Sequence, residues 1–262
     1  MLKLLTYFIF LLISIQSSDL KLISSFKIID KNFVTDNFDN IYSFSENTLK
    51  KYSIDGTLKS SFTNHFLGKI NSVDVTDPLR ILVYYKEYNQ VQFLDNNLVE
   101  LKSSIVLDEI GILASEAVCS SNDGGFWVFD SATEQLKYFN KNLENTNKSS
   151  RISEKSGYKP IKLVEKNDFI FMLYPDNELL IFDKFGTYIK KTSITNNDFQ
   201  IVNHRINYLK NNTLIRYDFT LFAEDSLTFP EEIKIEKLRI ENDKAFVFNN
   251  NTMNVYKLLI KF

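Results

Sequence analysis

The sequence predicts an all-β protein: a six-bladed β-propeller of four-stranded antiparallel blades, whose N-terminal strand completes the last blade. Three observations support this prediction. A short pattern recurs six times at intervals of about 40 residues, which is the length of a propeller blade. Aromatic and β-branched runs alternate with turn clusters, and no helical pattern of about 10 to 15 residues lies between them. The segment ahead of the first repeat resembles the outer strands of later repeats.

The recurring pattern is an Asn or Glu, a polar residue, a Leu, Val or Met, two variable residues, and an aromatic residue or Leu. Its copies are NTLKKY at 47–52, NQVQFL at 89–94, EQLKYF at 134–139, NELLIF at 177–182, NTLIRY at 212–217 and NTMNVY at 251–256. Successive copies are offset by 42, 45, 43, 35 and 39 residues. Six equivalent units therefore account for residues 19–262, which we predict to be one propeller domain.

Each unit is predicted to contain four short strands, A to D in chain order. An aromatic and β-branched run precedes every copy of the pattern, as in Phe126–Phe129 and Ala245–Phe248. Turn-forming residues precede that run, as in Asp36–Asp39 and Asn122–Gly125. In five units another turn follows the pattern, such as Asp55-Gly56 in the first. These signals predict the hairpins A–B, B–C and C–D.

The two ends of the propeller domain are predicted to meet in one blade. The sixth unit stops at Phe262, which leaves little room for its outer strand. The segment Leu20–Phe26 resembles the outer strands expected at Leu58–Phe62 and Leu101–Ile105. We therefore expect the N-terminal strand to be the fourth strand of the last blade, which would remove an open sheet edge and close the ring.

Residues 1–18 are predicted to be a signal peptide. Met1 and Lys3 are followed by an apolar run from Leu4 to Ile15 and then by small polar residues. A helix needs about 20 apolar residues to span a bilayer, and this run is shorter. No later segment is long and apolar enough to span. We expect an exported protein, periplasmic, outer-membrane-associated or extracellular, without a transmembrane segment in the mature chain. The single cysteine, Cys119, is expected to be a buried, inert thiol.

The first unit, TDNFDNIYSFSENTLKKYSIDGTLKSSF at 35–62, resembles an NHL-type propeller repeat, although Asp39 stands where that repeat usually has Gly. The segments ILVYYKEYNQVQFLDN at 81–96, CSSNDGGFWVFD at 119–130 and LLIFDKFGTYIK at 179–190 are similar to a group of secreted, uncharacterised propeller proteins of Bacteroidetes. These resemblances imply a propeller fold and export. They imply no catalytic residue.

The composition and motifs of the chain argue against several functions. A net charge of -2 and a pI near 5.8 give no basic field for nucleic acid. The two histidines, His65 and His204, are expected on different blades and opposite faces, so they do not form a shared site. No nucleophile elbow, P-loop, zinc-protease motif or paired C-x-x-C occurs. The sequence favours a non-catalytic protein, without a cofactor, and leaves enzymatic activity open.

The B–C turns carry the residues that we predict to contact a partner. These residues are Glu87, Tyr88, Asn89, Asp130, Asp176 and Asn177. Oxygen atoms at these turns would also suit Ca²⁺, whereas a simpler interpretation is that Asn and Asp serve the tight turns of a glycine-poor protein. Most aromatic residues are expected to fill the space between blades, with Tyr88 exposed in a polar loop. The polar stretch 148–157 is expected to be a solvated loop between blades.

The leading functional hypothesis is a non-catalytic, exported propeller that acts as a protein-binding or scaffold module of the cell envelope. Its basis is a rigid repeated frame with polar loops and no assembled reactive group. Two other hypotheses stay open. One is a Ca²⁺-dependent hydrolase or lyase at the mouth of the channel, which would need inward-pointing oxygen ligands on at least three blades. The other is a carbohydrate-binding module.

Overall fold

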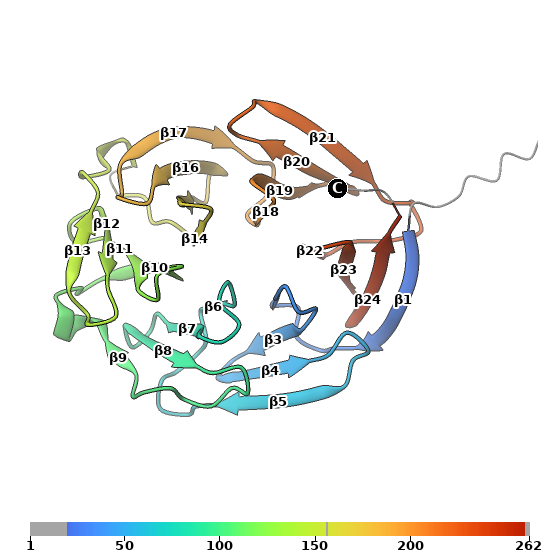
Figure 1. The fold of residues 1–262 in the computed structure, drawn as a ribbon, viewed down its shortest axis with the longest axis horizontal. Coiled ribbons are helices and arrows are strands. Elements are labelled where there is room, and N and C mark those ends of the chain that lie inside the picture. The colour runs from blue at the N-terminus through green and yellow to red at the C-terminus, as the bar shows by residue number, and fades with distance from the viewer. Residues whose placement is uncertain (1–19, 156, 260–262) are drawn as a thin grey trace, which may run out of the picture.

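The computed structural model describes residues 20–155 and 157–259 and shows six four-stranded antiparallel sheets arranged in a ring (Figure 1). The predicted six-bladed propeller is therefore confirmed. The predicted signal peptide at 1–18 lies outside the described residues.

The blades are numbered in chain order, and within each the strands run A to D from the centre outward. Blade 1 contains β2 (Phe33–Thr35), β3 (Ile41–Ser45), β4 (Thr48–Tyr52) and β5 (Leu58–Thr63). Blade 2 contains β6 (Ser72–Asp74), β7 (Ile81–Tyr85), β8 (Gln90–Leu94) and β9 (Ile105–Val106). Blade 3 contains β10 (Ser115–Ser120), β11 (Phe126–Asp130), β12 (Gln135–Phe139) and β13 (Asn145–Lys148). Blade 4 contains β14 (Lys162–Lys166), β15 (Phe169–Leu173), β16 (Glu178–Asp183) and β17 (Tyr188–Ser193). Blade 5 contains β18 (Gln200–Val202), β19 (Arg205–Lys210), β20 (Thr213–Asp218) and β21 (Ala223–Thr228). Blade 6 contains β22 (Lys237–Glu241), β23 (Lys244–Asn249), β24 (Thr252–Leu258) and β1 (Leu20–Lys27). Two short 3₁₀ helices, η1 (Leu107–Ile110) and η2 (Ser153–Lys155), lie in links between blades.

Strand β1 completes blade 6, as predicted. It pairs antiparallel with β24 from Leu20 opposite Leu258 to Lys27 opposite Thr252, with one irregularity between Leu22 and Ser24. In Figure 1 the blue N-terminal strand lies beside the red C-terminal strand at the outer edge of the ring. The first and last described strands of the chain thus share one sheet, and hydrogen bonds rather than a covalent link close the ring.

The hydrophobic core is divided into six clusters, one at each interface between neighbouring blades. Large side chains fill these interfaces: Trp127 is buried between blades 3 and 4, and Phe33 faces Phe248 between blades 1 and 6 with ring centroids 6.3 Å apart. Leu20 of β1 belongs to the cluster between blades 5 and 6, and Phe26 packs against the cluster between blades 6 and 1. Strand β1 therefore contributes to both interfaces of its blade.

The tight turns use a left-handed backbone, which a glycine-poor chain must obtain from other residues. Positive φ angles occur in the B–C turn of every blade, at Glu46, Asn89, Glu134, Asn177, Asn211, Asn250 and Asn251. This confirms the interpretation for Asn, whereas in blades 1 and 3 the left-handed residue is Glu rather than the expected Asn or Asp. Glycine is required at Gly56, where φ is 85° and a Cβ atom would lie 2.4 Å from the ring of Phe26.

Two predicted loop and strand features differ from the structure. The outer strand of blade 2 is only Ile105–Val106, with a single bridge between Leu94 and Glu100 in place of the expected longer strand. The stretch 148–157 is not a fully solvated loop, because Lys155 is buried there. Its ammonium lies 2.5 Å from Asp176 and 2.6 Å from Glu178 of the next blade. Carboxylates of a neighbouring unit thus hold a segment whose local composition predicts solvent exposure.

A disulfide between β1 and β24 should stabilise the ring. Ser25 is paired with Asn254, so the double substitution Ser25→Cys and Asn254→Cys should give one disulfide on oxidation. The native Cys119 is fully buried and should not compete for this bond. Because this bond closes almost the whole chain into a loop, the oxidised form should exceed the reduced form in free energy of unfolding by about 2–4 kcal/mol. Denaturant unfolding with and without reductant measures the difference. Failure of the bond to form would contradict the pairing.

Candidate functional site

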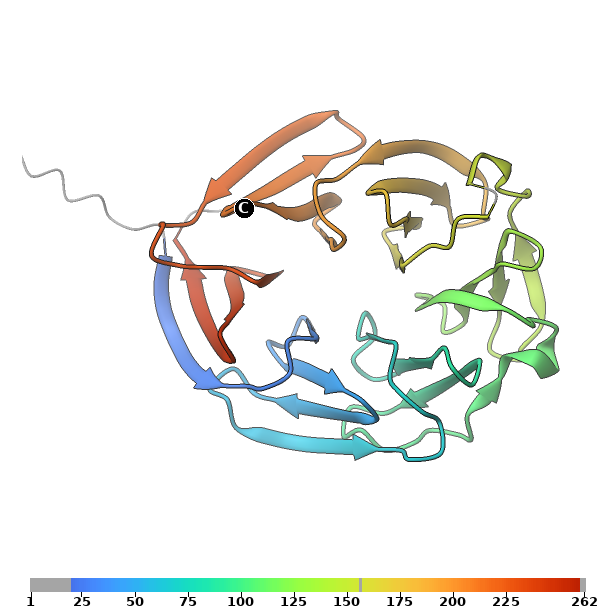
Figure 2. The same cartoon turned by 180° about the vertical axis from the view of Figure 1, so that it is seen from behind.

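The inner strands β2, β6, β10, β14, β18 and β22 surround the axis of the ring (Figures 1 and 2). A central channel of about 430 Å³ runs between them, and residues of all six blades line it. The inner strands begin at one face of the ring and end at the other, so the channel has two ends, and different charged residues lie at each.

The face at which the inner strands begin carries the B–C turns and the links between blades, and we name it the B–C face. A backbone hydrogen bond ties each link to the B–C turn of the blade before it. These bonds run from the N–H of Ile28, Ile70, Leu107, Ile152, Ile194 and Phe229 to the carbonyl of Asn251, Glu46, Asn89, Glu134, Asn177 and Asn212, over 2.6–3.0 Å. The loops of this face are therefore held to the blades in the same way six times.

The six residues predicted to contact a partner all lie in B–C turns or at their edges, in blades 2, 3 and 4. Two of them are committed to the fold. Asn89 donates to the carbonyl of Ile112 and to Asp108, and Asp130 accepts from Thr133 at 2.8 Å and binds Lys137 at 2.6 Å. Their side chains maintain the turns and the link that follows, so they are poor candidates for partner contacts.

The other four predicted residues differ in accessibility. Asp176 is partly exposed and ion-paired with Lys155, and Asn177 supplies a left-handed turn residue with φ of 65°. Glu87 and Tyr88 are exposed, and the Tyr88 ring packs beside Gly68 of the preceding link. The prediction that Tyr88 is exposed is confirmed, and the other aromatic residues considered with it, Tyr84, Tyr85, Trp127, Tyr138 and Tyr174, are buried.

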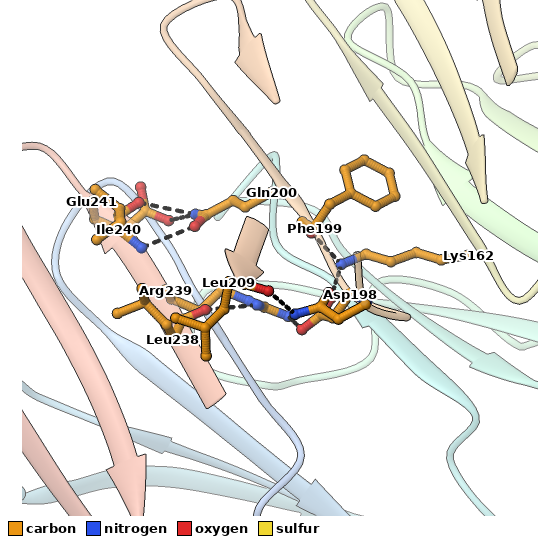
Figure 3. A network of polar contacts seen from close by, with 10 residues as sticks. Lys162, Asp198, Phe199, Gln200, Leu209, Leu238, Arg239, Ile240 and Glu241 are labelled. Carbon is orange, nitrogen blue, oxygen red and sulfur yellow. Dashed lines mark hydrogen bonds and ion pairs between the residues drawn. The ribbon is translucent and has the colours of Figure 1, made fainter. Parts of the chain in front are cut away.

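A cluster of charged side chains lies at the end of the channel nearest the B–C face (Figure 3). Lys162 begins β14 and its ammonium lies 2.5 Å from Asp198 Oδ1, in the link before blade 5. Arg239 of β22 reaches the other oxygen of the same carboxylate, with Nη2 2.6 Å from Oδ2. One carboxylate of blade 5 thus joins cations of blades 4 and 6.

The cluster contains a third cation, Lys237, two residues before Arg239 on β22. The ammonium of Lys237 lies 5.3 Å from the centroid of the Phe33 ring, and the Arg239 guanidinium lies 5.9 Å from the same centroid. Burial, together with the charges of Arg239 and Lys162, lowers the pKa of Lys237 to about 7. Burial would raise the pKa of Asp198, but the surrounding cations hold it well below its usual range. The field at this end is therefore positive.

The opposite end of the channel is lined by carboxylates. Glu241 ends β22 and accepts hydrogen bonds from Gln200 at 2.7 Å and from Thr35 at 2.8 Å, which links blades 5, 6 and 1. Gln200 also bonds both the N–H and the carbonyl of Ile240 (Figure 3). Burial raises the pKa of Glu241 to about 7 and raises that of Glu165 on β14. The two ends of the channel thus differ in their main charges, with Glu116 also near the positive end and Lys166 also near the opposite end.

The described residues contain no group of three His, Cys, Asp or Glu side chains that could hold a metal ion. His65 lies in the link after blade 1, where its Nδ1 is 2.8 Å from Asn47, and His204 lies in the A–B turn of blade 5 on the other face. The expected separation of the two histidines is confirmed. Cys119 is fully buried, as predicted, and burial raises the pKa of its thiol.

The charged cluster was not predicted from the sequence. Lys162, Asp198 and Arg239 are far apart in the chain and match no motif. A signal was nevertheless present, because Lys237 and Arg239 occupy an inner strand, where the chain otherwise places mainly apolar and small residues. An alignment of the six repeats could reveal this signal, because it would show basic residues on an inner strand.

No known protein family matches the sequence, and neither does any curated protein. The fold resembles the WD40 domain of Neurospora crassa Pan2, with a TM-score of 0.62, 9% identity, and 93% of this chain and 96% of that domain covered. It also resembles a streptogramin B lyase (TM-score 0.59, 11% identity, 92% and 88% covered). Virginiamycin B lyase from Staphylococcus aureus is similar too (TM-score 0.57, 10% identity, 92% and 90% covered). These likenesses support the propeller fold and identify no family or taxon.

Within residues 20–155 and 157–259, no helix has the length and apolar character needed to cross a bilayer.

Replacement of Glu241 by Gln should change how stability depends on pH. The folded pKa of Glu241, about 7, lies above the ordinary value of 4.5, so the folded chain holds an extra proton between these values and loses stability as the pH rises. Glu241→Gln keeps the acceptor oxygen and cannot ionise. The stability of the variant relative to the parent should therefore increase between pH 4.5 and pH 8, by up to about 3 kcal/mol.

Urea unfolding at several pH values measures this difference. Glu224→Gln, on the exposed outer strand β21, makes the same chemical change and serves as the control. Parallel stability curves for Glu241→Gln and the parent would contradict the raised pKa.

Proposed function

We propose that the chain is an exported, non-catalytic propeller that binds a protein partner on its B–C face, as a scaffold of the cell envelope. One observation carries this proposal: the loops of that face, which backbone hydrogen bonds tie to the B–C turns, expose large apolar side chains. They are Phe66 (87% exposed), Tyr88 (52%), Leu113 (73%) and Tyr158 (57%). They come from the links and turns of blades 1 to 4.

These side chains have the features of a protein-binding surface. Aromatic residues are enriched where proteins meet, and charged residues are more common at the rim. Ion pairs lie among the exposed apolar residues, between Lys69 and Glu46 at 3.0 Å and between Arg151 and Glu134 at 2.7 Å. The repeated hydrogen bonds between links and B–C turns hold the loops in place, which reduces the entropy lost when a partner binds.

The B–C turns offer less to the two other hypotheses. Catalysis that depends on Ca²⁺ would draw on the carboxylate and amide oxygens of these turns, yet Asp130 is bonded to Lys137 and Asn89 to the link that follows it. The lyases that share the fold do so at 10–11% identity, so their activities are not transferred to this chain. A carbohydrate-binding role would use exposed aromatic rings, and Tyr88 and Tyr158 are exposed.

Export is part of the proposal, with the periplasm, the outer-membrane surface or the extracellular space as the destination. It is supported by the apolar run at Leu4–Ile15 and the small polar residues after it. The fully buried Cys119 is compatible with an oxidising compartment, because its thiol is protected from disulfide exchange.

Substitution of Tyr88 or Tyr158 by Ser should weaken partner binding. The experiment isolates the mature chain from its native envelope fraction, identifies the protein bound to it, and measures the dissociation constant of the two purified proteins. Each substitution should raise that constant about tenfold, since removal of an anchoring aromatic residue costs about 1–2 kcal/mol. Thermal unfolding verifies that the variants are folded.

Phe185→Ser is the matched control, because Phe185 is 61% exposed in the C–D turn of blade 4, on the other face. Equal losses for the control and for Tyr88→Ser would contradict the assignment of the face. A glycan array on the same protein tests the carbohydrate alternative.

A further inference from the structure

The basic side chains at the positive end of the channel have no role in the proposed binding of a protein to the loops. We propose that Lys162, Lys237 and Arg239 form a binding site for an oxyanion, the carboxylate or phosphate group of a small ligand that enters the central channel. This inference is independent of the partner proposed above and rests on charge, hydrogen-bonding capacity and access.

The first argument is the imbalance of charge. Three cations share one carboxylate, and both oxygens of Asp198 are already occupied, Oδ1 by Lys162 and Oδ2 by Arg239. The ammonium of Lys237 has no ion pair or hydrogen bond to any residue among 20–155 and 157–259, and it contacts the Phe33 ring. Lys237 is partly buried and has no counterion of its own, so a bound anion would stabilise its charged form.

The other carboxylates near the cluster already have partners of their own. Asp74, whose charge acts on Lys162, accepts hydrogen bonds from the N–H groups of Thr76 and Ser120. Glu116 also lines the channel and begins near the same face, but it is itself paired with two cations, Lys86 at 2.5 Å and Lys159. Lys86 and Lys159 are well exposed, so water screens their charges. The carboxylates of Glu241 and Glu165 lie toward the opposite ends of their strands. Within a chain of net charge -2, cations are therefore concentrated at this site.

The second argument is hydrogen-bonding capacity. An ammonium group has three N–H donors. Lys162 uses two, to Asp198 and to the carbonyl of Phe199, each at 2.5 Å. Arg239 donates from Nη1 to the carbonyl of Leu238 at 2.8 Å and from Nη2 to Asp198. Donors of Lys162 and Lys237 thus remain for the oxygens of an anion, and charge-assisted hydrogen bonds of this kind are short and strong.

The third argument is access. Lys162 and Arg239 line the 430 Å³ channel, and 28% of the Lys162 side chain is exposed to it. Arg239 also lines a smaller cavity between blades 5 and 6, of about 50 Å³, together with Lys237 and Asp198. An oxyanion that enters through the channel could therefore contact Arg239, and Lys237 would attract it from the adjoining smaller cavity. The size of the channel restricts the ligand to a small molecule.

The test uses inorganic phosphate and acetate as probes, each at constant ionic strength against chloride. Binding is followed by isothermal titration calorimetry, and the acetylation rate of individual lysines by N-hydroxysuccinimidyl acetate is followed by mass spectrometry. One of the two anions should bind saturably and slow acetylation of Lys237 at least fivefold. Lys59, exposed on β5, should react at the same rate throughout. The anion that protects Lys237 distinguishes a phosphate site from a carboxylate site.

Lys237→Met should weaken binding of that anion about tenfold, and Lys59→Met should leave it unchanged. Lys237→Met breaks no hydrogen bond or ion pair among the described residues, and a thermal unfolding curve verifies that the variant is folded. Absence of saturable binding for both anions would overturn the proposal, and so would equal binding to Lys237→Met and the parent.

Discussion

The pairing of β1 with β24 is the interaction on which the rest of the structure depends. A propeller blade has two apolar faces, and it buries both only when it lies between two neighbours. Blade 6 receives its outer strand from the other end of the chain, and that strand places Leu20 in one interface and packs Phe26 at the other. Gly56 in blade 1 accommodates the Phe26 ring at close range, so β1 also contacts the first blade of the ring. Without β1, the last blade would expose an unpaired edge beside two incomplete interfaces.

Ring closure also determines the chemistry of the channel. Asp198 of blade 5 binds cations from blades 4 and 6, and Glu241 of blade 6 accepts hydrogen bonds from blades 5 and 1. These polar contacts join the inner strands of different blades, and they keep charged groups near one another at a fixed spacing. The positive end of the channel thus exists only while several blades are held together. A binding site built in this way is rigid before a ligand arrives, which favours affinity.

The local features of the fold could be predicted because each unit repeats them. The hexapeptide pattern indicated the blades, Asn at the B–C positions indicated left-handed turns, and the likeness of Leu20–Phe26 to an outer strand indicated the closure. The polar setting of Tyr88 correctly distinguished it from the buried aromatic residues. The channel cluster could not be predicted in the same way, because Lys162, Asp198 and Arg239 meet only through the curvature of the ring. Lys155 is a similar case, since the carboxylates that bury it, Asp176 and Glu178, belong to the following blade.

Hydrogen–deuterium exchange of a chain that begins at Asp19 and of a chain that begins at Ile28 tests the role of β1 most directly. If the ring depends on β1, its loss should accelerate exchange in β24 and β22 and also across the interfaces, in β2 of blade 1 and β18 of blade 5. Blade 3, on the far side of the ring, should change least. Unchanged protection of β22 and β24 in the shortened chain would contradict the account, because blade 6 would then be stable without its fourth strand.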